Sequence, residues 1–93
     1  MRERWWGASG RRVPELAAEG DPAVPVAEAL VLDEVDEAVL REAFAAGRPV
    51  VVRAGSAEAV KTALARPEVA SVLVPPDRHD LLSLDLTELT YGR

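Results

Sequence analysis

The chain has 93 residues, which is enough for one small domain and too few for a second hydrophobic core. With 48% hydrophobic and 29% charged residues it has the composition of a globular domain; it lacks cysteine for disulfides or thiolate chemistry, and no apolar run approaches the roughly 18 residues of a membrane span. The formal net charge of −5 disfavours nonspecific nucleic-acid binding, and we expect a cytoplasmic protein with no nucleic-acid or membrane partner.

Several residue types are absent or rare in this sequence. The sequence has no Asn, Gln or Ile, and Lys61 is its only lysine. The lack of Asn and Gln and the presence of prolines in loops suit a heat-tolerant protein. The codon bias of a GC-rich genome produces the same pattern. Composition leaves both explanations open.

Residues 1–27 are expected to form a basic N-terminal arm that contains the two tryptophans. Glycine and proline recur too densely here for a long element, although residues 13–20 fit two helical turns. Residues 1–14 hold four arginines and one glutamate, so this end of an acidic chain is basic. Trp5 and Trp6 stand among these arginines, and each can cover about 150–250 Å² of apolar surface.

Residues 28–93 have the pattern of a small α/β domain. Three short apolar runs, at 29–32, 50–52 and 69–74, alternate with two segments of helical periodicity. This order predicts a β-α-β-α-β unit with a parallel sheet of three strands, or of four if the leucines of 82–86 form a further strand rather than a helix. Because parallel crossovers are right-handed, the strand order 1-2-3 places both helices on one face.

Both helices carry recognisable start and stop signals. We expect Asp33 to cap the first helix, with Asp36 in its first turn, and Gly47 to end it. Ser56 is expected to cap the second helix, and Pro67 to end it. The first helix is expected to bury an apolar stripe of Val35, Val39, Leu40, Ala43 and Phe44. The stripe of the second comprises Ala57, Val60, Ala63 and Leu64.

The face of the sheet without helices must also be covered, because strands such as 50–52 have no polar side. The cover must come from the N-terminal arm, the C-terminal leucines or a second subunit. If the arm folds over its own sheet, its arginines dock on carboxylates and its tryptophans pack on apolar surface. If another chain provides the cover, Arg4, Trp5 and Trp6 are the candidate interface residues.

The leading functional hypothesis is therefore a non-enzymatic interaction or assembly protein that forms a homodimer and needs no cofactor. It rests on the helices covering one face only, on the tryptophan-containing arm and on the lack of a catalytic constellation. Arginines interleaved with tryptophans are also typical of single-stranded nucleic-acid binding, but the acidic body makes that hypothesis the weaker one.

The alternative is a regulatory module that binds a small anion or a phosphorylated metabolite. Ligands of open α/β sheets bind beyond the carboxyl ends of the strands, where Arg53, Gly55 and Ser56 follow the second strand. Gly55 lets the backbone approach an anion, Ser56 offers a hydroxyl at a helix start, and Arg53 supplies charge. The same residues fit an ordinary strand–turn–helix junction.

A third hypothesis is an enzyme based on His79, the only histidine. Flanked by Asp77 and Asp80, it has the chemistry of a metal ligand or a general base. It also fits an exposed loop histidine, and no nucleophile or ligand set accompanies it. We expect no catalytic residue and no metal.

Overall fold

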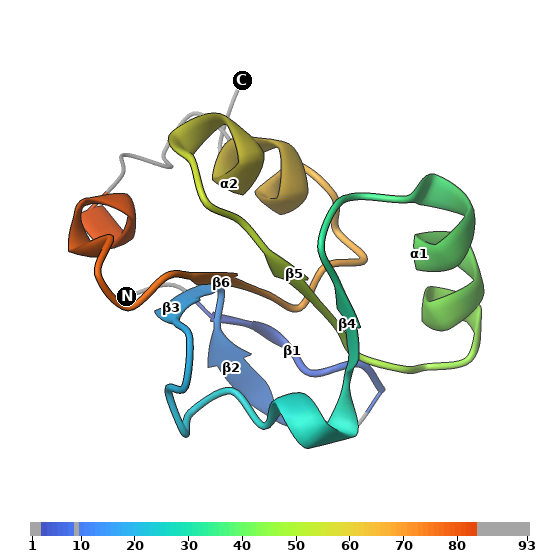
Figure 1. Ribbon diagram of the computed structural model, residues 1–93. Helices are drawn as coiled ribbons and strands as arrows, with labels where there is room; N and C mark the ends of the chain where they lie inside the picture. The colour runs from blue at the N-terminus through green and yellow to red at the C-terminus, as the bar shows by residue number, and fades with distance from the viewer. Residues whose placement is uncertain (1–2, 9, 84–93) are drawn as a thin grey trace.

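The computed structural model describes residues 3–8 and 10–83, without the side chains of His79 and Ser83 (Figure 1). Its strands are β1 (Glu3–Trp5), β2 (Arg12–Pro14), β3 (Leu16–Ala18), β4 (Leu30–Leu32), β5 (Val50–Arg53) and β6 (Ser71–Val74). Its α-helices are α1 (Glu37–Ala45) and α2 (Ala57–Leu64), and two short 3-10 helices are η1 (Val26–Glu28) and η2 (His79–Ser83). Neither α-helix in this part of the chain has the length and apolarity to cross a bilayer.

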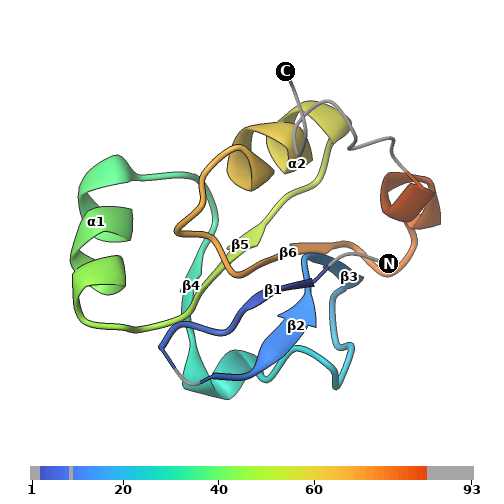
Figure 2. The same ribbon diagram turned by 180° about the vertical axis from the view of Figure 1, so that it is seen from behind.

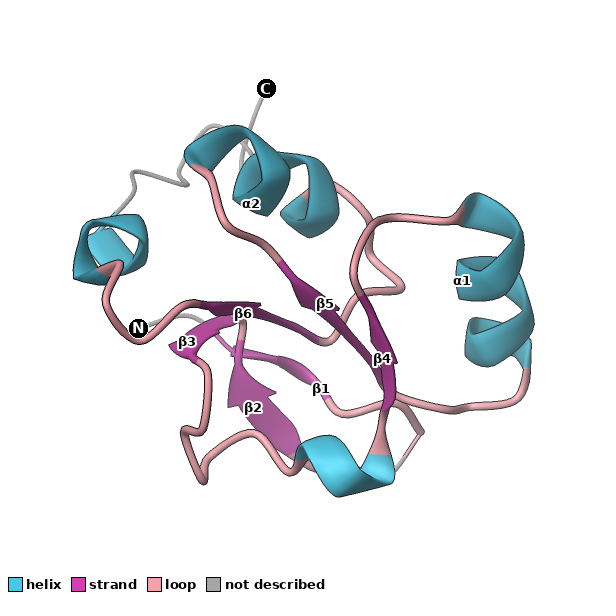
Figure 3. Ribbon diagram, in the orientation of Figure 1, coloured by secondary structure: helices cyan, strands magenta, loops and turns pink. Residues whose placement is uncertain are grey.

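The predicted α/β fold is confirmed. The main sheet has four parallel strands in the order β3-β6-β5-β4, and β1 pairs with β2 in a separate antiparallel hairpin. The expected β-α-β-α-β unit is β4-α1-β5-α2-β6, with α1 and α2 on the same face of the sheet (Figures 1 and 3). The fourth strand, however, is β3 from the N-terminal stretch. Leu82 lies in η2, and residues 84–86 are outside the described residues.

The helical turns expected at residues 13–20 are wrong, because this segment forms β2 and β3. The backbone N–H of Val72 donates to the carbonyl of Glu15 at 2.9 Å, and the hydroxyl of Ser71 donates to the carbonyl of Pro14 at 2.8 Å. The free edge of β6 thus offers this segment a ladder of hydrogen bonds. Tertiary pairing of this kind overrides the weak helical propensity of a short segment.

Helix α1 begins later than expected, since Asp36 and not Asp33 is its cap. The Asp36 carboxylate accepts hydrogen bonds from the backbone N–H groups of Ala38 and Val39 at 3.1 and 3.2 Å. The three residues before it bridge the end of β4 to the helix and place Val35 against the core. Val35 packs against the core between the two aspartates, and the helix begins only after Asp36.

The other helix signals are confirmed. The Ser56 hydroxyl accepts from the backbone N–H of Ala59 at 3.2 Å, so it caps α2. Helix α2 ends at Leu64, shortly before Pro67. Gly47 has a φ of +71° just after α1, the left-handed conformation that commonly ends a helix.

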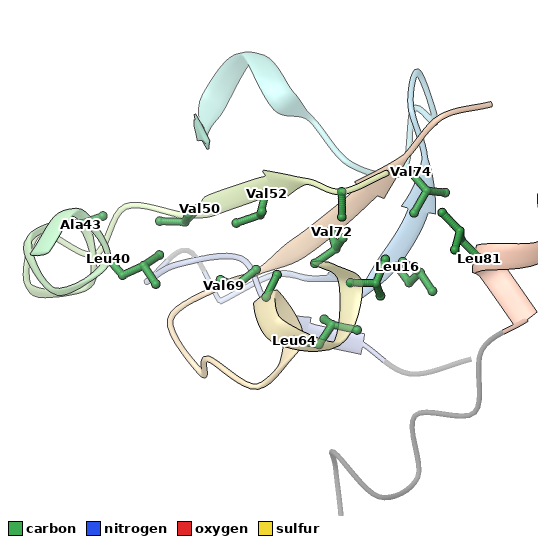
Figure 4. Packing of buried hydrophobic residues seen from close by; sticks show 13 residues of the cluster. Leu16, Leu40, Ala43, Val50, Val52, Leu64, Val69, Val72, Val74 and Leu81 are labelled. Carbon is green, nitrogen blue, oxygen red and sulfur yellow. The ribbon is translucent and has the colours of Figure 1, made fainter. Parts of the chain in front are cut away.

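The helix side of the sheet holds the larger of two apolar clusters (Figure 4). Side chains alternate along β5, so Val50 and Val52 face the helices and Val51 faces away. The helices add Leu40, Ala43, Val60, Ala63, Leu64 and Leu81. Phe44 was expected in this cluster but is 67% exposed. Helix α1 lies over the β4 edge of the sheet, and its buried stripe is confined to Leu40 and Ala43 (Figure 1).

The same chain covers the opposite face. The β1-β2 hairpin and the crossover from β3 to β4, which contains η1, lie across it (Figures 1 and 2). The cluster on this side comprises Trp6, Val13, Ala17, Val24, Ala29, Val51, Ala70 and Leu73. Trp6 is its largest member and is only 1% exposed. Of the three possible covers for this face, the structure therefore shows the N-terminal arm folded over its own sheet.

The hairpin turn touches the loop between α1 and β5 through two glycines. The backbone N–H of Ala8 donates to the carbonyl of Gly47 at 3.0 Å, and Gly7 has a φ of +58°. A Cβ atom on Gly7 would lie 2.5 Å from that carbonyl oxygen and 2.9 Å from Pro49. Only glycine at position 7 allows so close an approach.

We expect Gly7→Ala to destabilise the fold more than Gly10→Ala. Gly10 also has a positive φ, of +81°, but a Cβ atom there meets nothing within 4 Å. Gly10→Ala should therefore cost only the left-handed backbone term of roughly 1–2 kcal/mol. Gly7→Ala adds a backbone clash to the same term. Thermal unfolding of the two variants measures the difference, and equal melting temperatures would contradict the close contact.

We expect Trp6→Ala to lower the free energy of unfolding by about 3–5 kcal/mol, the usual range for a fully buried large aromatic residue. Trp5→Ala is the matched control, because Trp5 is 57% exposed and should cost about 1 kcal/mol or less. Urea unfolding provides both values. Similar losses for the two variants would mean that Trp6 does not cover the sheet as described.

Candidate functional site

The structure brings the three predicted anion-binding residues to the carboxyl edge of the sheet. Arg53 ends β5, and its guanidinium pairs with Glu19, with Nε 3.2 Å from Oε1 and Nη2 donating to Oε2 at 3.4 Å. Asp33 lies 4.0 Å from the same guanidinium. The Ser56 hydroxyl caps α2, and the Gly55 carbonyl accepts from Arg78 at 3.2 Å. An incoming anion would have to compete with Glu19 for Arg53, and the anion site stays a prediction.

Arg78 is the second cation at this edge, and Asp80 holds it in a bidentate pair at 3.1 Å. The hydrogen bonds from Arg78 keep the pKa of the Asp80 carboxyl below its usual value, and the pKa of Arg78 is raised by the same pair. Within the described residues, no three His, Cys, Asp or Glu side chains gather as metal ligands would. The side chain of His79 is outside the described part, so the enzyme hypothesis stays a prediction from the sequence.

Arg4, a predicted interface residue, instead ties the N-terminal hairpin to its own chain. Its Nε donates to Glu15 at 3.2 Å. Its Nη1 donates to the carbonyls of Arg66 and Val69, each at 3.0 Å, and its Nη2 donates to the carbonyl of Leu64. Two of these carbonyls belong to the C-terminal end of α2 and the turn after it, where a cation is favoured by the helix dipole.

The two tryptophans lie on opposite sides of the hairpin. Trp6 packs inward, and its indole N–H points to Glu28 at 3.4 Å. Trp5 is exposed, and the guanidinium of Arg12 lies 4.5 Å from the centre of its ring. Trp5 and Arg12 face each other across the β1-β2 pair, so this contact is a cross-strand cation–π pair.

A groove of about 580 Å³ opens beside Trp5, at the amino-terminal edge of the parallel strands. Its walls are β1 and the hairpin turn on one side and the end of α1 with the following loop on the other. The loop before β6 completes it. The lining residues are Glu3, Arg4, Trp5, Gly7, Ala8, Phe44, Gly47, Arg48, Pro67 and Glu68. We call this site the aromatic groove, because Trp5 and Phe44 both line it and both are exposed.

The charges of the aromatic groove are balanced, with two carboxylates and two guanidiniums. Arg4 is held inside the fold, as described above. Glu68 lies 3.7 Å from Arg66 in a long ion pair, and the two facing atoms are buried without a hydrogen-bond partner in the described part of the chain. Glu3 and Arg48 are exposed and form no ion pair with any described side chain.

Sequence reasoning missed Phe44 and Arg48 as members of a site. It placed Phe44 in the buried stripe and did not single out Arg48. The available signal was that Phe44 is the only phenylalanine and lies at the margin of that stripe. Comparison of the chain with family models, curated proteins and solved structures finds no match. The two edges of the sheet are therefore interpreted from their geometry.

We expect Arg4→Ala to lower the free energy of unfolding by about 3 kcal/mol, because it removes a largely buried guanidinium with four hydrogen bonds. Arg12→Ala is the control on the same hairpin. Its exposed contact with Trp5 should be worth about 0.5–1 kcal/mol. Chemical denaturation of both variants checks the difference. If Arg4→Ala lowered the free energy of unfolding no more than Arg12→Ala does, the hydrogen bonds of Arg4 would have no role in holding the hairpin.

Proposed function

We propose that the chain is a non-enzymatic interaction protein of the cytoplasm, and that it self-associates as a homodimer through the aromatic groove. The observation that supports this proposal is the exposure of Trp5 and Phe44, at 57% and 67%, on the walls of one groove. Heat tolerance remains a prediction from composition alone.

Two exposed aromatic side chains at one place are more informative than scattered apolar residues. Single exposed hydrophobic residues are normal on protein surfaces, whereas apolar patches that are rimmed by charge mark interaction sites. Tryptophan and other aromatic residues are enriched in such interfaces, and a few of them contribute most of the binding free energy. The other large exposed hydrophobic residues among those described, Val26 and Leu82, do not line the groove.

The charges of the aromatic groove permit a second copy of the chain as the partner. The net charge of −5 means that two copies of the chain repel each other overall. The aromatic groove has equal numbers of acidic and basic side chains, so two copies that meet there bring no excess of like charge together. A two-fold interface uses the same patch on both copies and requires that the patch complements itself. Trp6 and Arg4 are engaged inside their own chain, so the proposed contact depends on Trp5 and Phe44.

Glu19 already neutralises Arg53, so an anion at the junction of Arg53, Gly55 and Ser56 would have to displace the Glu19 carboxylate.

We expect the chain to dimerise in sedimentation velocity experiments over a micromolar to millimolar range, and Phe44→Glu to weaken the dimer at least about 30-fold, as the loss of an interface hot spot does. Ala45→Glu is the matched control, because Ala45 is the next residue on α1 and is exposed outside the groove. A wild-type chain that stays monomeric at all concentrations would contradict the proposal. Equal effects of the two variants would place the interface elsewhere.

A further inference from the structure

The opposed walls of the aromatic groove carry opposite charges that are unpaired within the described part of the chain. Glu3 is the first residue of β1, on the hairpin wall. Arg48 lies between α1 and β5, on the facing wall. We infer that Glu3 of each copy pairs with Arg48 of the other, so that each groove is completed by a side chain of the second copy. This inference rests on the homodimer proposed above.

The other two charges of the groove are not available for such a pairing. Arg4 directs its donors to Glu15 and to three carbonyls of its own chain. Glu68 faces Arg66, and its side chain is only 17% exposed. Glu3 and Arg48 are the exposed pair that remains.

A two-fold axis makes this pairing reciprocal. In such an interface, if residue i of one copy meets residue j of the other, then j also meets i. An acid on one wall and a base on the other satisfy this condition twice in one dimer. If instead each wall of one copy met the same wall of the other, Glu3 would meet Glu3 and Arg48 would meet Arg48. Like-charge repulsion disfavours that arrangement.

The same orientation also matches the aromatic residues. Glu3 and Trp5 are two positions apart on β1 and both point outward, whereas Arg4 between them points inward. Phe44 and Arg48 lie on the facing wall. Bringing Glu3 to Arg48 of the second copy therefore brings Trp5 toward its Phe44. The apolar contacts supply affinity, and the charges fix the orientation.

Charge reversal tests the inference. Glu3→Arg alone and Arg48→Glu alone should each weaken the dimer about tenfold or more in sedimentation velocity, because each places like charges together. The double variant Glu3→Arg/Arg48→Glu should regain most of the wild-type affinity. An equimolar mixture of the two single variants should form mainly heterodimers by native mass spectrometry, because both pairs are then restored between unlike chains.

Glu58→Arg is the control for a change of net charge. Glu58 is an exposed residue of α2 outside the aromatic groove, and its reversal should leave the dimer intact. If the single reversals leave the affinity unchanged, or if neither the double variant nor the mixture recovers it, the pairing is wrong. If the pairing fails in this way but Phe44→Glu still disrupts the dimer, the proposed homodimer stands and only the contact between Glu3 and Arg48 is wrong. A monomeric wild-type chain would overturn both.

Discussion

A parallel sheet of valine-rich strands has two apolar faces, and the rest of this fold depends on covering the second one. Helices α1 and α2 cover the first face, and the β1-β2 hairpin with the β3–β4 crossover covers the other. Trp6 supplies the largest apolar side chain of that cover. Arg4 holds the hairpin to the end of α2 and to Glu15, so the cover is fixed by hydrogen bonds at its margin and by apolar contact at its centre.

The aromatic groove is a consequence of how the hairpin is attached. Side chains alternate along β1, so a strand that turns Arg4 and then Trp6 toward the body must turn Glu3 and Trp5 outward. The hairpin turn also rests against Gly47, which brings Trp5 beside the end of α1, where Phe44 is exposed. The contacts that attach the hairpin to the rest of the chain therefore also form the aromatic groove, an apolar surface between two charged walls.

Sequence patterns predicted the parts of the structure that depend on neighbours along the chain. The β-α-β-α-β order and the cap at Ser56 follow from short-range periodicity and end signals, and the placement of both helices on one face follows from the right-handed crossovers between successive strands. Strand β3 was missed because its partner in β6 is more than fifty residues away. The role of Arg4 was missed for the same reason, since its carbonyl partners lie near residues 64–69. Phe44 was misplaced because periodicity gives the direction of a side chain on a helix and not where the sheet ends beneath it.

Hydrogen exchange measured at several protein concentrations tests the central claim that this chain covers its own sheet. The indole N–H of Trp6 and the amide of Val72, which binds the carbonyl of Glu15, report on the cover directly. Both should exchange only through global unfolding, with the same protection as the amides of β5 at every protein concentration. Protection that is far weaker than in β5, or that is lost on dilution while β5 stays protected, would show that the second face is not covered by its own N-terminal hairpin.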